Sequence, residues 1–341
     1  MDVMGDRRAT VVGFGAALVV LAILVFVVGV ADLLAALGRA DRRVVALMVP
    51  VALGWLLSWG LALRTVLSVL GVSVSVPRAF ATFAAATFAN NVTPFGQAGG
   101  EPVTALFIAN SSEAEYETGL AAIASVDALN FVPSIAFALL GFGYSATTFT
   151  VGRRFRLAAG AVVVLALLVV GSVFVGWQRR HRLEAAALRV VSPVLHGVGR
   201  IVPRVSPPTK EALRGRVESF FHAIDRVATD RRQLGVALTF SALGWLGQMT
   251  SLWLGLYAVD ATVSPAVVLV AVPVAALSGI APLPGGLGGV EAILVALLVP
   301  IPAVSGPAAA AAVVLHRGVT YWLPLLLGAV AAGRLGTGPV P

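Results

Sequence analysis

The segment PFGQAGGE at Pro94–Glu101 returns in the second half of the chain as PGGLGGVE at Pro284–Glu291. The proline, two glycines and the glutamate coincide in the two copies. Glycine permits tight turns, and a glutamate directly after such a turn sits where a helix can begin. The two segments therefore predict that a helix is interrupted and restarted in two corresponding places.

Two further matches share the sequence offset that separates these segments. The pentapeptide ALGWL occurs at Ala52–Leu56 and again at Ala242–Leu246. A charged residue follows each glutamate at one and the same distance, as Asp127 after Glu101 and as Arg317 after Glu291. Since three matches share one offset, the sequence predicts two internal repeats, at about 44–143 and about 234–333.

The composition is that of a membrane protein. Hydrophobic residues make up 58% of the 341 residues, charged residues 12%, and the mean hydropathy is +0.94. A span takes about 20 apolar residues, and helices satisfy their own backbone hydrogen bonds in lipid. We therefore expect an all-α, polytopic helix bundle forming a single integral membrane domain. Its predicted spans are Thr10–Val30, Val44–Leu63, Gly119–Gly143, Leu157–Gly176, Leu234–Ala258 and Pro307–Ala332.

The chain has a net charge of +8, but its positive charges are not arranged for nucleic acid. Of the 24 Lys and Arg residues, 12 lie within Trp177–Arg232, the long polar segment between the repeats. A basic segment beside membrane helices is typical of the cytoplasmic side. The sequence therefore predicts a multi-pass protein of the plasma membrane, with this segment inside.

An amphipathic helix is predicted within the basic segment, after Ser206-Pro207-Pro208. Apolar residues recur there at helical spacing: Leu213, Val217, Phe220, Phe221, Ile224 and Val227. Such a helix either packs against the bundle or lies in the headgroup region of the membrane.

Shorter apolar pieces flank the two glycine-rich breaks, and they decide the topology. Ala79–Ala89 and Glu101–Asn110 each cover about half of the hydrocarbon core, and residues 90–100 between them are expected not to be helical. Val263–Ala281 and Glu291–Ile301 flank the second break. Each pair forms either a re-entrant hairpin, which makes the repeats inverted, or one broken span, which makes them parallel.

Charge counting leaves both topologies open. With the basic segment inside, the hairpin places the N-terminus and Arg64–Arg78 inside but Arg39, Arg42 and Arg43 outside. The broken span reverses these assignments. We favour the hairpin, because non-helical backbone at membrane depth survives where protein or a cavity surrounds it, and because inverted repeats with broken helices are a common transporter plan.

Four ionisable side chains fall within or beside apolar helices: Glu101, Asp127, Glu291 and Arg317. Such groups must be paired or face water. The glutamates either cap helices or bind substrate. Arg317 either forms a buried ion pair with one of the carboxylates or holds a phosphate, which guanidinium binds in bidentate fashion.

Other chemistry finds little support in the sequence. The histidines show no metal-ligand spacing, the cysteine count is zero, and Pro284–Gly289 lacks the lysine ending of a phosphate loop. No nucleophile–base set stands out, and no aromatic cage is evident. We therefore expect no catalytic residues, no metal and no cofactor.

At these residues the chain resembles the transmembrane region of lysylphosphatidylglycerol synthases and the related flippase-like membrane proteins. The resemblance covers about Arg7 to Arg334, and Pro284–Glu291 is its most specific part. It also rests on Gly100-Glu101, on Asp127 and on Arg317 before Tyr321-Trp322-Leu323-Pro324. The family often has an arginine shortly after its first Gly-Glu, where this chain has Pro102-Val103-Thr104-Ala105.

The resemblance implies a protein that moves a phospholipid or a polyprenyl-phosphate-linked lipid between leaflets. Arg317 is then expected to hold the lipid phosphate, while Glu101, Asp127 and Glu291 receive a cationic headgroup or exchange a proton. The other expected substrate-binding residues are Pro94, Gly99, Gly100, Pro284, Gly285 and Gly286. Two alternatives are a membrane scaffold for a separate transferase, and an intramembrane enzyme acting on a lipid-linked substrate.

Overall fold

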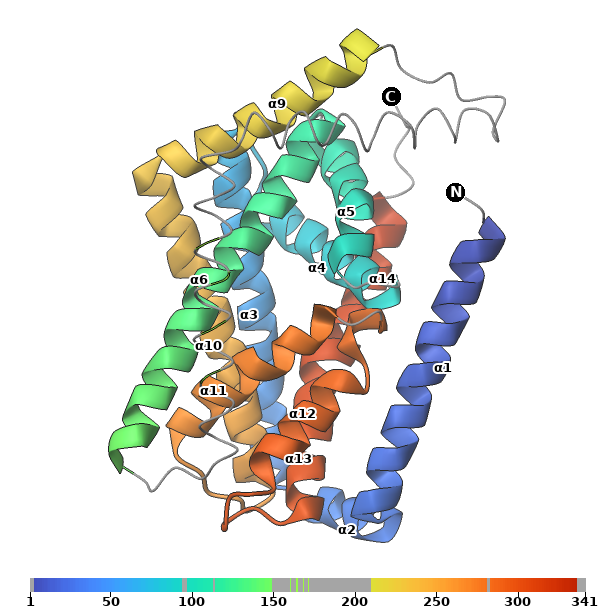
Figure 1. Cartoon of the computed structure of the whole chain (residues 1–341), viewed down its shortest axis with the longest axis vertical. Helices are drawn as coiled ribbons and strands as arrows, with labels where there is room; N and C mark the ends of the chain where they lie inside the picture. Colours follow the sequence, from blue (N-terminus) through green and yellow to red (C-terminus); the bar gives the residue numbers. More distant parts are fainter. Residues whose placement is uncertain are drawn as a thin grey trace.

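The computed structural model describes residues 3–93, 97–112, 114–148, 210–280 and 283–335, with isolated positions between 160 and 171. These residues form an all-helical bundle, as the sequence predicts, and Figure 1 shows its arrangement. The predicted span Leu157–Gly176, most of the basic segment and Pro94 lie outside the described residues. The helices are α1 (Val3–Val28), α2 (Val30–Arg39), α3 (Arg42–Val69), α4 (Val76–Val92), α5 (Gln97–Ser112), α6 (Tyr116–Thr148), α9 (Lys210–Thr229), α10 (Arg231–Ala258), α11 (Pro265–Ala276), α12 (Gly289–Leu298), α13 (Gly306–Arg317) and α14 (Leu323–Leu335).

Two sets of helices follow one another in the same order. Helix α3 of the first set corresponds to α10 of the second, and these helices begin at Arg42 and Arg231. Helix α6 corresponds to α13, and the offset between their starts at Tyr116 and Gly306 is nearly the same. The two sets run in opposite directions. Asp41, just before α3, donates its backbone N–H to the carbonyl of Ala258 at the end of α10 over 2.8 Å. This antiparallel arrangement is the one that inverted repeats produce, although duplication of the sequence itself stays a prediction.

The short helices form two hairpins that enter from opposite ends of the bundle. Helices α4 and α5 pack together in the upper half of Figure 1, and α11 and α12 pack together in the lower half. Two short 3-10 turns, Leu277–Ile280 and Pro284–Gly286, lie between α11 and α12. The predicted break over residues 90–100 is too long, because α4 continues to Val92 and α5 begins at Gln97. The structure therefore has the hairpin arrangement rather than one broken span.

Small residues let the two sets of helices approach closely. A side-chain carbon at Gly247 of α10 would lie 2.7 Å from Cβ of Trp55 in α3, and one at Gly141 of α6 would lie 2.6 Å from Cβ of Leu269 in α11. Gly328 of α14 faces the backbone of Ala84 in α4 in the same way. The last long helix of each set thus packs against the hairpin of the other set. This exchange fixes the two hairpin tips relative to each other.

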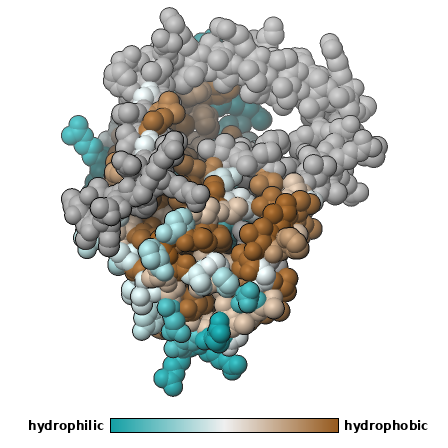
Figure 2. Space-filling model, turned by 60° about the horizontal axis from the view of Figure 1, so that its bottom comes forward, coloured by the Kyte–Doolittle hydropathy of each residue, from teal (hydrophilic) through white to brown (hydrophobic). Residues whose placement is uncertain are grey.

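Three of the described helical segments are long and apolar enough to cross a membrane: Arg42–Val69, Tyr116–Ser145 and Gly306–Leu335. The count is four if α1 and α2, bent by 82° at Gly29, are taken together. Helix α10 forms where the span Leu234–Ala258 was predicted. It is not among the three apolar segments, because Gln248, Ser251 and its glycines lower its mean hydropathy. Figure 2 shows broad apolar surface, with polar side chains gathered towards the lower edge of the view.

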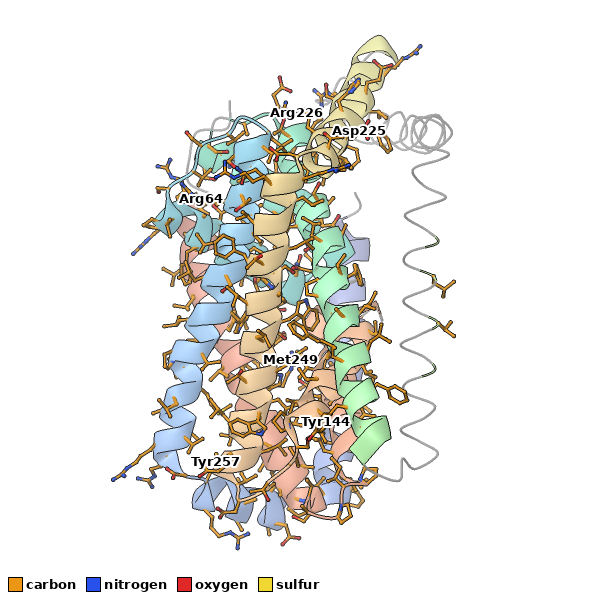
Figure 3. All side chains as sticks on the ribbon, turned by 90° about the vertical axis from the view of Figure 1, so that its left-hand side faces the viewer. Arg64, Tyr144, Asp225, Arg226, Met249 and Tyr257 are labelled. Carbon is orange, nitrogen blue, oxygen red and sulfur yellow. The ribbon has the colours of Figure 1, made fainter. Side chains whose placement is uncertain are left out.

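The two ends of the bundle carry different side chains. Arg64, Asp225 and Arg226 lie at one end in Figure 3, and Tyr144 and Tyr257 lie towards the other. Helix α9 packs across the first end, where Arg226 donates to the carbonyl of Val69 over 2.6 Å. The predicted amphipathic helix is therefore present and packs against the bundle. Its placement in the headgroup region stays a prediction.

Candidate functional site

A cavity of 520 Å³ lies between the two hairpin tips. Helices α3, α4, α6 and α10 contribute to its wall, together with residues of α5, α11, α12 and α13. Among the described residues of the wall, the charged or titratable side chains are those of Glu101, Asp127, His316 and Arg317. Three of the four ionisable residues predicted from the sequence therefore face one cavity. The fourth, Glu291, lies behind Arg317.

Arg317 and Glu291 form a buried ion pair. Nε of Arg317 donates to Oε1 of Glu291 over 2.6 Å, and the two side chains are 12% and 7% exposed. Nη2 of Arg317 also donates to the carbonyl of Gly285 over 3.0 Å. The other carboxylate oxygen of Glu291 accepts from the backbone N–H of Gly288 over 2.7 Å. Glu291 therefore caps the start of α12 and orients the guanidinium at the same time.

The backbone that presents these groups depends on glycine. Gly285, Gly286 and Gly288 have φ values of 54°, 66° and 81°, in the left-handed region that other residues rarely adopt. This conformation turns the carbonyl of Gly285 towards Arg317 and the N–H of Gly288 towards Glu291. The glycine-rich segment thus shapes the arginine site through its backbone.

A short π-helix, Gly318–Trp322, follows Arg317 and brings Tyr321 beneath it. The guanidinium carbon of Arg317 lies 4.6 Å from the centre of the Tyr321 ring, which gives a cation–π contact. The hydroxyl of Tyr321 donates to the carbonyl of Asn91, near the end of α4, over 3.3 Å. Such π-helical insertions occur frequently at functional sites. Here the insertion connects the arginine of the second helix set to the hairpin of the first.

Glu101 and Asp127 approach each other on the opposite part of the wall. Glu101 lies in the first turns of α5, and Asp127 lies in α6 and is 9% exposed. Their carboxyl groups are within hydrogen-bonding reach of each other. Among the described residues, no donor is bonded to Oδ2 of Asp127. The structure therefore separates the four ionisable residues into an Arg317–Glu291 pair and a Glu101–Asp127 pair.

The predicted glycines and prolines contribute unequally. Gly285 and Gly286 line the cavity, whereas Pro284 is buried but is not among the residues of the wall. Gly100 packs against the side chain of Asn90, which occupies the space that a larger residue would need. Gly99 is not part of the wall.

The sequence showed no aromatic cage, but the structure gathers three tryptophans on the cavity wall. Trp59 makes edge-to-face contacts with Trp55, Trp245 and Phe83, at ring-centre distances of 5.1, 5.7 and 5.9 Å. Trp55 and Trp245 are the tryptophans of the two ALGWL segments. Trp55 and Trp245 occupy corresponding positions in the two predicted repeats, and this correspondence hinted that they lie close together. The spacing of residues within one helix gives no such hint.

Uncharged polar residues complete the wall: Thr87, Asn90, Asn91, Asn130, Ser134, Gln248 and Thr320. His316 also reaches the cavity, and its Nδ1 is hydrogen-bonded to the hydroxyl of Ser251 at 3.1 Å. No group of three or more potential metal ligands of the His, Cys, Asp or Glu type occurs among the described residues. The arrangement offers a fixed cation for an anionic group and a carboxyl pair for a cationic one.

Fold and site together define an integral membrane protein with a cavity between two helical hairpins, lined by apolar residues and by a set of charged and polar side chains. The sequence pattern of one family, described as the lysylphosphatidylglycerol synthase TM region, matches residues 12–328, and the chain belongs to this family. A "UPF0104 membrane protein" of Pyrococcus horikoshii is 25% identical over 302 residues, covering 86% of this chain and 87% of the relative. Two proteins of the same description from Methanothermobacter thermautotrophicus are 25% and 26% identical over 94% and 96% of this chain and 93% of each relative.

Proposed function

We propose that this protein moves a lipid with a phosphate in its headgroup between the leaflets of the plasma membrane. The observation that supports this most is Arg317, a guanidinium held on the wall of a cavity at the meeting point of two hairpins. The family match also supports a phosphate-containing lipid as substrate. The family is described as the membrane region of lysylphosphatidylglycerol synthases, which are named for a phospholipid.

Arg317 is oriented for an anion by its own contacts. Nε is bonded to Glu291 and Nη2 to Gly285, and among the described residues no acceptor is bonded to Nη1. The Nη1 edge is therefore available to a phosphate oxygen, and charge-assisted bonds of this kind are strong in a site with little water. A guanidinium that is already positioned loses little side-chain entropy when it binds.

The cavity suits a headgroup rather than a whole lipid. Its volume of 520 Å³ is within the usual range for small-molecule sites, about 300–1,000 Å³. Acyl chains would then remain in the surrounding bilayer, while the headgroup crosses between the hairpin tips. Opposed hairpins that meet near the midplane give such a site access from either side in turn.

Transport can be measured with purified protein in liposomes that contain a fluorescent phospholipid, by dithionite quenching of the outer leaflet. We expect the intact protein to accelerate lipid exchange, and Arg317→Ala to lower the rate at least tenfold. Arg64→Ala is the matched control, since Arg64 also donates to a backbone carbonyl, that of Val74 over 2.8 Å, but lies at one end of the bundle.

Equal rates for the intact protein and Arg317→Ala would refute the phosphate site. Absence of exchange by the intact protein, with anionic and with polyprenyl-phosphate lipids, would instead favour the scaffold hypothesis, in which the protein serves a separate transferase. That partner stays a prediction, since most of the basic segment expected to bind it is outside the described residues.

A further inference from the structure

The Glu101–Asp127 pair has no positive partner in the described part of the cavity. Arg317 is already paired with Glu291, and His316 is bonded to Ser251. Two carboxyl groups this close do not both stay ionised without a nearby positive charge, so the pair must hold either a shared proton or a cation.

Hydrogen bonding at the pair is also incomplete. Oδ2 of Asp127 and Oδ1 of Asn90 are buried acceptors, and no donor is bonded to either among the described residues. Asn90 packs against Gly100, the residue before Glu101, and lines the same cavity as the pair. Buried acceptors in folded proteins nearly always have a partner. Unbonded buried acceptors on a wall that also carries a carboxyl pair are the groups that a positively charged ligand would satisfy.

We propose that Asn90, Glu101 and Asp127 form a binding site for one monovalent cation, either an alkali ion or an ammonium group. Carboxylate and amide oxygen atoms coordinate hard metal cations and also accept hydrogen bonds from an ammonium group. A single cation compensates the repulsion between the carboxylates and satisfies the free acceptors at once. A role of the cation in driving transport rests on the proposed function, whereas its binding does not.

Gly100 is part of the reason the site exists. The Asn90 side chain occupies the position of a Cβ atom at Gly100, and the backbone of Asn90 lies 2.7 Å from that position. Any larger residue would push α4 and α5 apart and move the amide away from the carboxylates. The second glycine-rich segment instead contributes the carbonyl of Gly285 to the arginine site of α13.

The tryptophans on the same wall provide a signal that is independent of lipid transport. Trp55, Trp59 and Trp245 line the cavity together with Asp127. Binding of a cation changes the electric field at these rings and hence their fluorescence. Purified protein in detergent is titrated with NaCl at constant ionic strength, with choline chloride as the balancing salt, and separately with butylammonium chloride.

We expect a saturable fluorescence change with at least one of these two cations, and at least tenfold weaker apparent affinity in both Asp127→Asn and Glu101→Gln. Lowering the pH should weaken binding, because protons compete for the carboxylates. Glu117→Gln is the matched control, since Glu117 pairs with Arg216 at 3.3 Å beside α9, away from the cavity, and should bind as the intact protein does.

A response to NaCl identifies an alkali ion from solution as the ligand, whereas a response to butylammonium alone identifies an ammonium group such as a lipid headgroup carries. A response to pH alone would overturn the proposal, because the pair would then hold only a proton. An unchanged response in both variants, with normal thermal unfolding, would overturn it as well. Neither result depends on whether Arg317→Ala alters lipid exchange.

Discussion

Arg317 of α13 donates from Nε to Oε1 of Glu291 in α12 over 2.6 Å, and both side chains are buried. The same carboxylate accepts from the N–H of Gly288, so one glutamate serves the helix start and the arginine together. The two interpretations of these residues that the sequence left open, a helix cap and an ion pair, are both present in one arrangement.

Removing the charge of Glu291 should destabilise the protein strongly. In Glu291→Gln an amide oxygen can still accept from Gly288, but Arg317 keeps a buried charge without a carboxylate. Breaking a buried pair in this way costs about 3–5 kcal/mol. We expect a clear fall in the thermal unfolding temperature in detergent.

Glu218→Gln is the control for that measurement. Glu218 pairs with Arg214 on the surface of α9, where the side chains are 48% and 71% exposed. Exposed pairs contribute about 0–1 kcal/mol, so its unfolding temperature should be close to that of the intact protein. A similar fall in unfolding temperature in the two variants would show that the Arg317–Glu291 pair stabilises the protein no more than an exposed ion pair does.

Replacing Gly285 by alanine should disturb the arginine site through the backbone. Gly285 has a φ of 54°, and a Cβ atom there would lie 2.5 Å from the Tyr321 ring and 2.6 Å from Oδ1 of Asn91. Backbone strain and overpacking each cost about 1–3 kcal/mol. Gly285→Ala should therefore lower both the unfolding temperature and lipid exchange. Gly54→Ala, which meets nothing within 4 Å on α3, should lower neither.

The hydroxyl of Tyr321 connects the two halves of the structure and can be removed without removing the ring. Tyr321→Phe loses the 3.3 Å bond to the carbonyl of Asn91 but keeps the aromatic face beneath Arg317. We expect a loss of about 0.5–1.5 kcal/mol, the usual net contribution of one hydrogen bond. Tyr321→Leu should cost more, because it also removes the cation–π contact. Thermal unfolding of the two variants side by side measures the difference.

Cysteine labelling can test the topology directly, because the chain contains no cysteine of its own. Gly38 in α2 and Ala228 in α9 are exposed, and these two helices lie at opposite ends of the bundle in Figure 1. In intact cells, a maleimide that does not cross membranes should label Gly38→Cys and leave Ala228→Cys unlabelled. The broken-span topology instead places both positions on the cytoplasmic side, so equal protection of the two cysteines would support it.

Much of the fold could be predicted from the sequence, because glycine-rich breaks and apolar lengths are local properties. The breaks after α4 and α11 were predicted in the right places. The extent of the first break was wrong, since Asn90 and Asn91 remain helical by packing across the bundle. Charge counting could not choose between the topologies, whereas the contact of Asp41 with Ala258 requires antiparallel sets.

The pairing within the site could not be predicted. Arg317 had three possible carboxylate partners, and only the register of α12 against α13 selects Glu291. The meeting of Trp55 and Trp245 around Trp59 likewise depends on contacts between α3 and α10, which are far apart along the chain. Such contacts follow from packing of the two sets of helices and have no signature within either segment.

The most direct test of the central claim is to block the cavity. Ala276 lines the cavity and is exposed, so Ala276→Cys can be modified with a bulky maleimide in reconstituted protein. We predict that lipid exchange by the Ala276→Cys protein is normal before modification and is lost after it. The Gly38→Cys protein should still exchange lipid after modification. Exchange that continues at the same rate after complete modification of Ala276→Cys would contradict a lipid pathway through this cavity.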